Sequence, residues 1–317
     1  MTDCSCDLER FSSREDMYDL LKGFDGLELM HMEEDGKGMI SADMVTGYHA
    51  VFPEYWVDFY RGSCKRLEKE FDTLEKAFNY YGGSEPKLLS ERLKKEYENA
   101  CRYGALYMVV HVSDAGSFEE ITGKYHYSDK EVILSFCEML NAALPGPETC
   151  SSGCPYVLLE NMWQPGLNFK DPEMTALLME NVRYPKKGIM LDTGHLMHTD
   201  ISIKDQKEGL EYINKRLDEH GDLCRYIKGI HLNQSETSHV MKKYMEDPPV
   251  PAKTFEERTG QLFTYIFSID LHRPFVCPGV TDLIERISPE FLTFEFISND
   301  LEEHRKMLED QKAALNL

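Results

Sequence analysis

The chain has few basic residues for its length and no long apolar run. Lysine and arginine number 35 against 56 aspartates and glutamates, so the 317 residues carry a formal net charge of −21. Proteins bind nucleic acid through basic residues that displace counterions from phosphates, so this charge argues against duplex DNA as a partner. It argues equally against anionic membranes. No apolar stretch approaches the roughly 20 residues that span a bilayer, so we expect no membrane segment.

Other common signatures are also missing. The opening MTDCSCDLERF has neither the basic stretch nor the apolar stretch of a secretory signal. The nine cysteines are odd in number and scattered, which favours a reducing cytoplasm over a disulfide framework. The sequence shows no glycine-rich phosphate loop and no dinucleotide-binding fingerprint. We therefore expect a cytoplasmic protein whose function must be sought in other side chains.

The sequence does contain an alternation of short apolar strands with longer amphipathic helices. The strands are apolar throughout, as in a parallel sheet covered by helices. This length suits one (β/α)8 barrel, so we predict an α/β TIM barrel spanning 1–317 as a single domain. The seventh strand has the weakest pattern and can also be read as the end of a helix. The expected strands are 24–30, 44–52, 105–112, 156–161, 188–194, 226–233, 266–272 and 291–297.

Residues 234–260 interrupt this alternation. They are polar and contain the sequence DPPVP. We interpret them as an insertion into the barrel that roofs the pocket.

Seven of the apolar segments end with residues that bind divalent metals. The C-terminal ends of the strands of such a barrel meet at one mouth, so these side chains should converge. Imidazole and carboxylate together suit zinc first, with manganese or iron as alternatives. The first strand offers only Glu28 and His31. We predict a metal centre built from His49, His111, Glu160, Asp192, His195, His231, Asp270, His272 and Glu295.

Each of these residues alone has a simpler explanation. A histidine at a strand end is more often a hydrogen-bonded core or surface residue, and the segment from Asp192 to His195 could be an ordinary turn. Glu160 and Glu295 lie within apolar sequence. Because a buried unpaired carboxylate is costly, a cationic partner is favoured for these two. The seven segments in series indicate a metal site where one alone would not.

The ligand set resembles that of the xylose-isomerase-like TIM barrels, which include sugar isomerases, sugar epimerases and endonuclease IV. In the isomerase and epimerase branch, one metal takes Glu, Asp, His and Glu from strands 4, 5, 6 and 8. His195 resembles the histidine that contacts substrate in that branch. The matching metal ligands here are Glu160, Asp192, His231 and Glu295.

The endonuclease IV branch resembles the chain more fully. That branch adds a His on strand 2, a His on strand 3 and an Asp-x-His near strand 7, similar to His49, His111 and Asp270-Leu-His272. The gap from His231 to Asp270 is longer than in that branch. The resemblance implies two to three metals per chain. They would be held by His49, His111 and a bridging Glu160; by Glu160, Asp192, His231 and Glu295; and by His195, Asp270 and His272.

Two enzymatic functions fit these residues. The first is a metal-dependent hydrolase with an endonuclease IV-like multinuclear site, acting on a phosphate ester or diester of a small molecule rather than on duplex DNA. The second is a mononuclear sugar or polyol isomerase or epimerase, in which Glu160 and Glu295 move a proton and His195 contacts substrate. A barrel without activity is disfavoured because every ligand type is present. Trp163 and Arg273 are expected to contact the phosphorylated or polyhydroxylated substrate, and the sequence does not indicate an oligomeric state.

Overall fold

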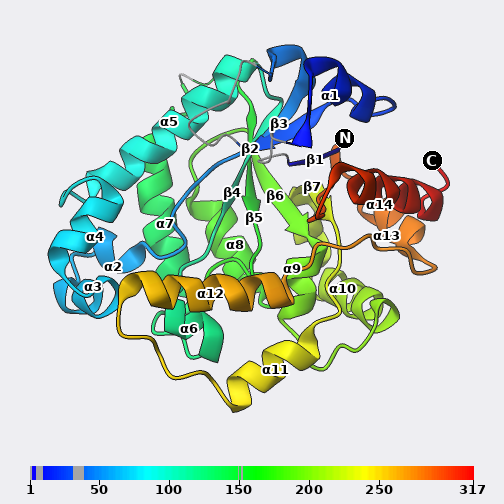
Figure 1. Ribbon diagram of the computed structural model, residues 1–317. Coiled ribbons are helices and arrows are strands. Elements are labelled where there is room, and N and C mark those ends of the chain that lie inside the picture. The colour runs from blue at the N-terminus through cyan, green and yellow to red at the C-terminus, as the bar shows by residue number, and fades with distance from the viewer. Residues whose placement is uncertain (1, 5–9, 31–38, 149, 151–152) are drawn as a thin grey trace.

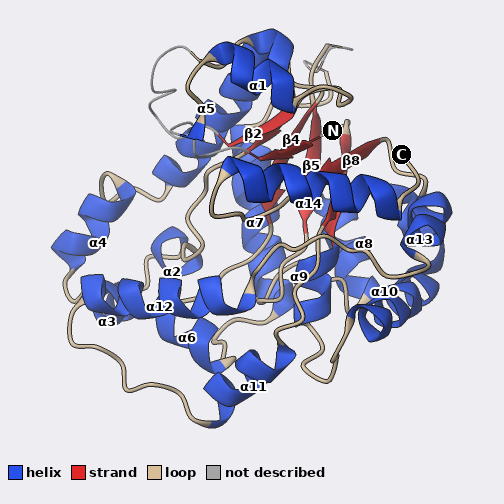
Figure 2. Cartoon of the chain, turned by 45° about the vertical axis from the view of Figure 1, so that its right-hand side comes forward, coloured by secondary structure: helices blue, strands red, loops and turns tan. Residues whose placement is uncertain are grey.

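The computed structural model describes residues 2–4, 10–30, 39–148, 150 and 153–317. Eight parallel strands form one sheet in the order β1 to β8, and β1 comes close to β8, so the sheet is a nearly closed barrel. Helices surround it (Figures 1 and 2), which confirms the predicted α/β TIM barrel. The strands are β1 (Thr2–Cys4), β2 (Leu27–Met30), β3 (Val45–His49), β4 (Tyr107–His111), β5 (Tyr156–Glu160), β6 (Lys187–Asp192), β7 (Ile227–Leu232) and β8 (Phe291–Phe294).

Most helices lie between successive strands and cover the outside of the barrel. Between β3 and β4 the chain forms four helices. The α-helices are α1 (Arg14–Leu20), α2 (Val57–Tyr60), α3 (Cys64–Phe71), α4 (Leu74–Tyr81), α5 (Lys87–Tyr103), α6 (Ser117–Thr122), α7 (Asp129–Ala143), α8 (Pro172–Asn181), α9 (Thr193–His198), α10 (Gln206–His220), α11 (Ser238–Glu246), α12 (Phe255–Ile269), α13 (Val280–Ile287) and α14 (Leu301–Ala314), with 3-10 helices η2 (Ala42–Met44) and η3 (Gly221–Tyr226).

The strands are buried on both faces, which explains their uniformly apolar sequences. Along β4, Tyr107 and Val109 belong to a small cluster with Leu158 and Met190, whereas the alternate residues join the large core. Gly47 on β3 makes room for Tyr107, because a Cβ there would lie 2.2 Å from the tyrosine ring. The Tyr107 hydroxyl then donates a hydrogen bond to Glu28 at 2.5 Å.

The predicted strand at 266–272 is wrong. Residues up to Ile269 belong to α12 instead. This helix starts with a capping box between Thr254 and Glu257. A helix that begins in this way continues as long as its apolar residues recur at helical spacing. β7 therefore pairs directly with β8. The barrel still has eight strands, because a strand that was not predicted, β1, lies at the N-terminal end and pairs with β2. It is too short, at three residues, to be recognised by its pattern.

The segment interpreted as an insertion, 234–260, contains α11 and the start of α12. α12 runs across one end of the barrel, near α6 and the loops that follow the strands (Figure 1). The extent of the insertion and of the single domain stay predictions. Among the described residues, no helix is both long and apolar enough to cross a membrane.

Candidate metal centre

Six of the nine predicted ligands sit where barrel strands end, on β3 to β8. They are brought to one end of the barrel because all eight strands run in the same direction. All are largely buried, the most exposed being the side chains of His111 at 22% and Glu295 at 13%. The six are His49, His111, Glu160 and Asp192, each the last residue of its strand, His231 within β7, and Glu295 directly after β8.

Glu160 lies at the centre of this group and is fully buried. Its Oε2 atom lies 3.2 Å from His49 Nε2 and 3.3 Å from His111 Nε2. Its Oε1 atom lies 3.2 Å from His231 Nδ1 and 3.3 Å from His195 Nδ1. The two oxygens of one carboxylate therefore face two different pairs of imidazoles.

Two groups of possible ligands share Glu160. One nitrogen or oxygen from each of His49, His111 and Glu160 lies within 4.8 Å of the others. The same holds for the four residues Glu160, Asp192, His231 and Glu295. In this second group His231 Nδ1 is 2.8 Å from Glu295 Oε2 and 3.9 Å from Asp192 Oδ2. These are the two sets implied by the sequence resemblance.

A third group adjoins them, close to the set expected from the sequence. Asp270 Oδ2 lies 3.0 Å from His272 Nε2 and 3.6 Å from His195 Nε2. Asp270 directly follows α12 as its C-terminal cap, and His272 lies in the next loop with a positive φ of 46°. The atoms within 4.8 Å of one another come from Asp192, His195 and His272, so either aspartate could complete this group.

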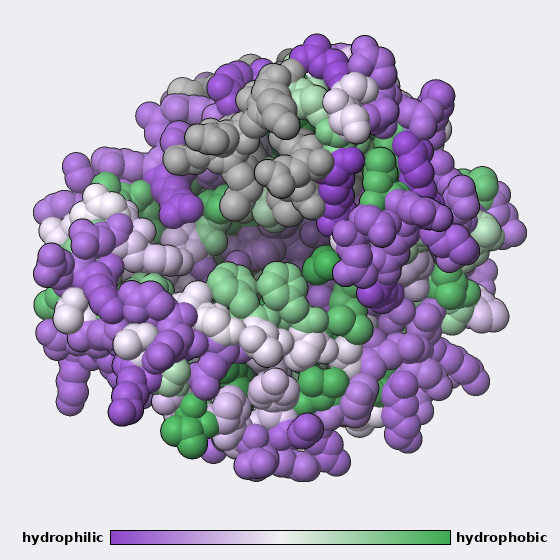
Figure 3. Space-filling model, in the orientation of Figure 1, coloured by the Kyte–Doolittle hydropathy of each residue, from purple (hydrophilic) through white to green (hydrophobic). Residues whose placement is uncertain are grey.

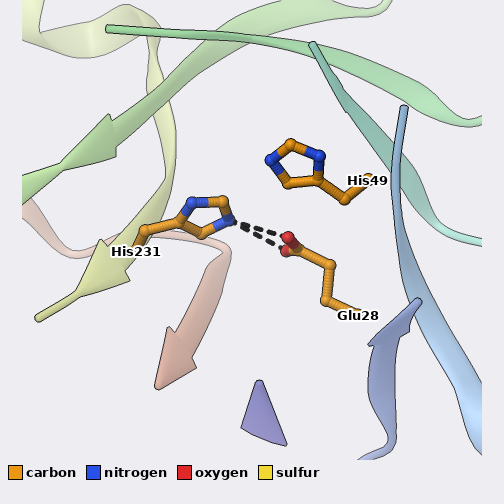
Figure 4. Close-up of side chains that lie close together, drawn as sticks. All are labelled: Glu28, His49 and His231. Atoms are coloured by element: carbon orange, nitrogen blue, oxygen red, sulfur yellow. Dashed lines mark hydrogen bonds and ion pairs between the residues drawn. The ribbon is translucent and has the colours of Figure 1, made fainter. Parts of the chain in front are cut away.

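Two carboxylates that were not predicted as site residues contact ligand histidines at the outer ring nitrogen, the one that faces away from Glu160. His231 Nε2 donates to Glu28 Oε2 at 3.0 Å and lies 2.9 Å from Oε1, and the ring of His49 lies beside this pair (Figure 4). His111 Nδ1 lies 2.8 Å from Oε1 of Glu54, in the loop after β3. Carboxylates in this position fix the orientation of metal-binding histidines. The only signal for Glu28 in the sequence is a carboxylate within an apolar strand.

Two asparagines orient Asp192. Asn233 donates to Asp192 Oδ2 at 2.7 Å, and the backbone N–H of His195 donates to Oδ1 at 2.6 Å. Asn161 exchanges two hydrogen bonds with the Asp192 backbone, of 2.9 and 3.0 Å. The carboxylate is thus fixed at the end of β6, where it also caps α9. The sequence pattern did not single out these asparagines.

The cluster has a characteristic electrostatic balance. Burial alone would raise the pKa of Glu160, but His231 and His111 outweigh it and hold that pKa well below its usual range. Burial is likewise outweighed at Glu295, where His231 and His272 lower the pKa to about 2. Burial would lower the pKa of His111, but Glu54 and Glu160 raise it to about 10. Protonated imidazoles therefore offset the buried carboxylates when no metal is bound, and a divalent cation can take over that role.

The residues present fit a divalent metal. His272 Nδ1 and Asp270 Oδ1 are buried without a hydrogen-bond partner in the described part of the chain, and buried polar atoms rarely stay without one. The donors are imidazole nitrogens and carboxylate oxygens, the set that zinc, manganese and iron accept.

The cluster opens into a cavity of about 870 Å³, visible as a hollow in Figure 3. Trp163 lines this cavity, and its indole N–H donates to Glu120 at 2.5 Å. Arg273 is not among the described residues that line the cavity; its guanidinium pairs with Glu303 at 2.7 Å. His31 lies outside the described residues. The cavity is lined by six of the predicted ligands, namely His49, His111, His195, Asp270, His272 and Glu295.

Comparison with solved structures shows the same fold. The IOLI protein with a binding zinc atom aligns with 100% of this chain and 98% of its own, at 13% identity and a TM-score of 0.53. The 3-keto-D-glucoside 4-epimerase YcjR from E. coli aligns with 98% of each chain, at 12% identity and a TM-score of 0.52. At these identities the likeness concerns the fold alone.

Comparison of sequences is more specific. A protein described as probable endonuclease 4 from Malacoplasma penetrans (strain HF-2) is 29% identical over 122 residues, which are 38% of this chain and 39% of that protein. The match thus spans about two fifths of the length of this curated relative. Residues 22–311 match the family described as the xylose isomerase-like TIM barrel. The chain belongs to the xylose isomerase-like TIM barrel family.

Proposed function

We propose that the protein is a metal-dependent hydrolase that acts on a phosphate ester or diester of a small molecule through a multinuclear site. The observation that carries this proposal is the placement of Glu160. One of its oxygens faces His49 and His111, and the other faces His195 and His231. A carboxylate placed between two ligand sets is suited to bridge two metals, whereas a single-metal site needs only one side of it.

The proposed metals would be held by three groups that share or adjoin Glu160. Zinc is the first choice, with manganese or iron as alternatives, and two to three ions per chain are expected from these ligands. Bound metals would supply Lewis acidity and positive charge toward the oxygens of a substrate. The groups are His49, His111 and Glu160; Glu160, Asp192, His231 and Glu295; and His195 and His272 with Asp270 or Asp192.

The protein's own residues prepare this site by fixing the orientation of the ligand side chains. Glu28 and Glu54 hold the outer nitrogens of His231 and His111, so the inner nitrogens face Glu160. Fixed ligands of this kind do not have to reorganise when substrate binds. Trp163 lies edge-on to His195, with ring centroids 5.1 Å apart, and lines the cavity beside the cluster.

A small molecule is favoured over duplex DNA as the substrate. The chain carries a formal charge of −21. Among the described residues that line the cavity, Arg10 is the only lysine or arginine. A DNA backbone would therefore find few partners here, because its binding depends on basic side chains along the surface. A cytoplasmic location stays a prediction from cysteine usage.

The proposal is tested by turnover after metal loading. Wild-type protein loaded with zinc or manganese is expected to release nitrophenol from p-nitrophenyl phosphate or bis-p-nitrophenyl phosphate. Glu160→Gln should lose at least about a hundredfold, which corresponds to ~2.7 kcal/mol of barrier. Glu290→Gln is the matched control, because Glu290 pairs with Lys228 on the surface and precedes β8. Hydrolysis by Glu160→Gln within about tenfold of wild type would refute the assignment.

A mononuclear sugar or polyol isomerase or epimerase is the second candidate. The group of Glu160, Asp192, His231 and Glu295 is complete without the other ligands. Glu160 and Glu295 both lie within 3.2 Å of His231 Nδ1, so two carboxylates adjoin one site, as a proton transfer would need. This function predicts one metal per chain and exchange of a substrate C–H for deuterium in D2O, which the hydrolase does not.

A further inference from the structure

The cavity above the metal centre has a largely aromatic and aliphatic wall. α12 contributes one side of it, and its residues Leu262, Phe263, Ile266 and Phe267 all line the cavity. The rings of Phe263 and Phe267 stack at 6.1 Å between centroids. Both are unusually exposed for phenylalanine, at 53% and 62%. Figure 3 shows hydrophobic residues gathered along the edge of the hollow, over α12.

This apolar wall is continuous with the metal centre. The same cavity is lined by His195, Asp270 and His272 at its base and by Phe263 and Phe267 on its side. Its volume, about 870 Å³, lies within the range of sites that enclose most of a small ligand. A molecule bound at the ligand cluster would therefore extend along α12.

The wall is held in place before any ligand arrives. Asp72, directly after α3, accepts a hydrogen bond from the backbone N–H of Phe255 at 2.8 Å and pairs with Arg258 at 2.6 Å. The same carboxylate pairs with Lys76 at 2.9 Å. The N-terminal part of α12 is thereby fixed to α3 and α4. The exposed phenylalanines are thus presented on a supported helix.

The cavity wall suits an uncharged group. Its carboxylates outside the ligand cluster each have a partner on at least one oxygen: Glu54 pairs with His111, Glu70 accepts from the backbone of Ser117, and Glu120 accepts from Trp163 through Oε1 while its Oε2 has no hydrogen-bond partner among the described residues. Exposed phenyl rings recover favourable free energy when an apolar group covers them. A second charged group on the ligand would find little compensation on this side.

We propose that the substrate is amphipathic, with its reacting polar end at the ligand cluster and an uncharged alkyl or aryl arm against Phe263 and Phe267. The position of the polar end rests on the proposed function, whereas the arm rests on the cavity wall alone. Continuity with the cluster and the enclosed volume favour a small molecule over a second protein as the occupant.

The test uses n-alkylphosphonates from methyl to octyl, whose C–P bond the proposed hydrolase does not cleave, with binding measured by titration calorimetry on metal-loaded protein. Each buried methylene should tighten the dissociation constant about three- to fourfold until the wall is covered. Phe263→Ser with Phe267→Ser should reduce this dependence on chain length to roughly half or less. Serine and phenylalanine have similar helix propensities, so α12 should persist. Leu134→Ser is the matched control, because Leu134 is 40% exposed on α7 and does not line this cavity.

The experiment distinguishes failure of the arm site from failure of the proposed function. A parallel series of n-alkyl glucosides, which lack phosphate, should show the same dependence on chain length if the arm site exists. Weak binding of methylphosphonate with a preserved dependence on chain length would count against the proposed function only. Affinity independent of chain length would overturn the arm site, as would an unchanged dependence in the double variant. A dimer of the wild type in sedimentation that the double variant loses would also overturn it.

Discussion

The Nε2 atom of His231 lies 2.9 Å from Oε1 of Glu28, while Nδ1 of the same ring faces Glu160, Glu295 and Asp192. Glu28 is itself held by the hydroxyl groups of Tyr107 and Thr293, at 2.5 and 3.2 Å. The core of the barrel therefore determines which nitrogen of His231 is available to a metal. A buried carboxylate on β2 thus acts on the centre through the histidine.

Substitution of Glu28 tests this relationship. Glu28→Gln should lower metal affinity by about 10- to 100-fold, the range typical for partners of ligand histidines. The metal count at saturation should not change, because Glu28 orients His231 and is not required as a ligand. Competition against a chromogenic chelator measures the affinity, and Glu290→Gln should match wild type. A lost metal at saturation would make Glu28 a ligand, and an unchanged affinity would remove its role.

Metal binding should release protons. In the metal-free protein, Glu54 and Glu160 outweigh burial and raise the pKa of His111 to about 10, and Asp270 and Glu295 do the same for His272, to about 9. Both imidazoles are therefore protonated at pH 7 and must lose a proton to bind metal. Affinity should weaken as the pH falls. Calorimetric titration in buffers of different ionisation enthalpy measures the protons released, and heats that do not depend on the buffer would contradict this prediction.

Glu120 should titrate near neutral pH. Burial raises its pKa to about 7, even though Trp163 and Gln164 hydrogen bonds oppose this. The emission of Trp163 should then change with a midpoint near pH 7 in a Trp56→Phe background, since the chain has two tryptophans. Glu120→Gln should abolish that transition.

The same group makes a prediction about stability. A carboxyl whose folded pKa is raised contributes stability below its unfolded pKa of about 4.5, and that contribution is lost as the pH rises to about 7. Glu120→Gln removes the titration. The free energy of unfolding of the variant, measured relative to that of wild type, should therefore rise by on the order of 2 to 3 kcal/mol between these pH values. Urea denaturation at pH 5 and pH 8 measures the difference. A gain that is the same at both values would show that Glu120 titrates normally.

Duplex DNA should not bind at physiological salt. A formal charge of −21 opposes the counterion release that supplies most non-specific affinity. Fluorescence anisotropy with an abasic-site duplex is the measurement. Micromolar or tighter binding at ~0.15 M salt, with cleavage at the abasic site, would restore a role in DNA repair.

The strand ends were predictable because their chemistry is local. His49, His111, Glu160 and Asp192 each follow an apolar run, and parallel strands bring such residues to one edge. Asp270 and His272 were predicted as ligands at the end of a strand, but they follow the helix α12. An apolar run of this length has no periodicity that separates a strand from the last turn of a helix.

The supporting residues depend on contacts between distant segments. Glu28 and His231 are 203 residues apart, and nothing near Glu28 in the chain indicates its partner. Glu54 lies in a loop, where an exposed carboxylate is the ordinary expectation. The aromatic wall was equally hidden, because Phe263 and Phe267 have the spacing of core residues on a helix and only the structure places them at a cavity.

The metal content of Glu160→Gln beside wild type tests the central claim most directly. After loading with zinc and removal of loosely bound ions, elemental analysis of wild type should give two to three metals per chain, as the ligand groups around Glu160 imply. Glu160→Gln should retain fewer, with its fold intact by circular dichroism, because both proposed sites that share Glu160 lose a ligand. A single metal in wild type, bound by Glu160, Asp192, His231 and Glu295, would contradict the multinuclear centre and favour the isomerase.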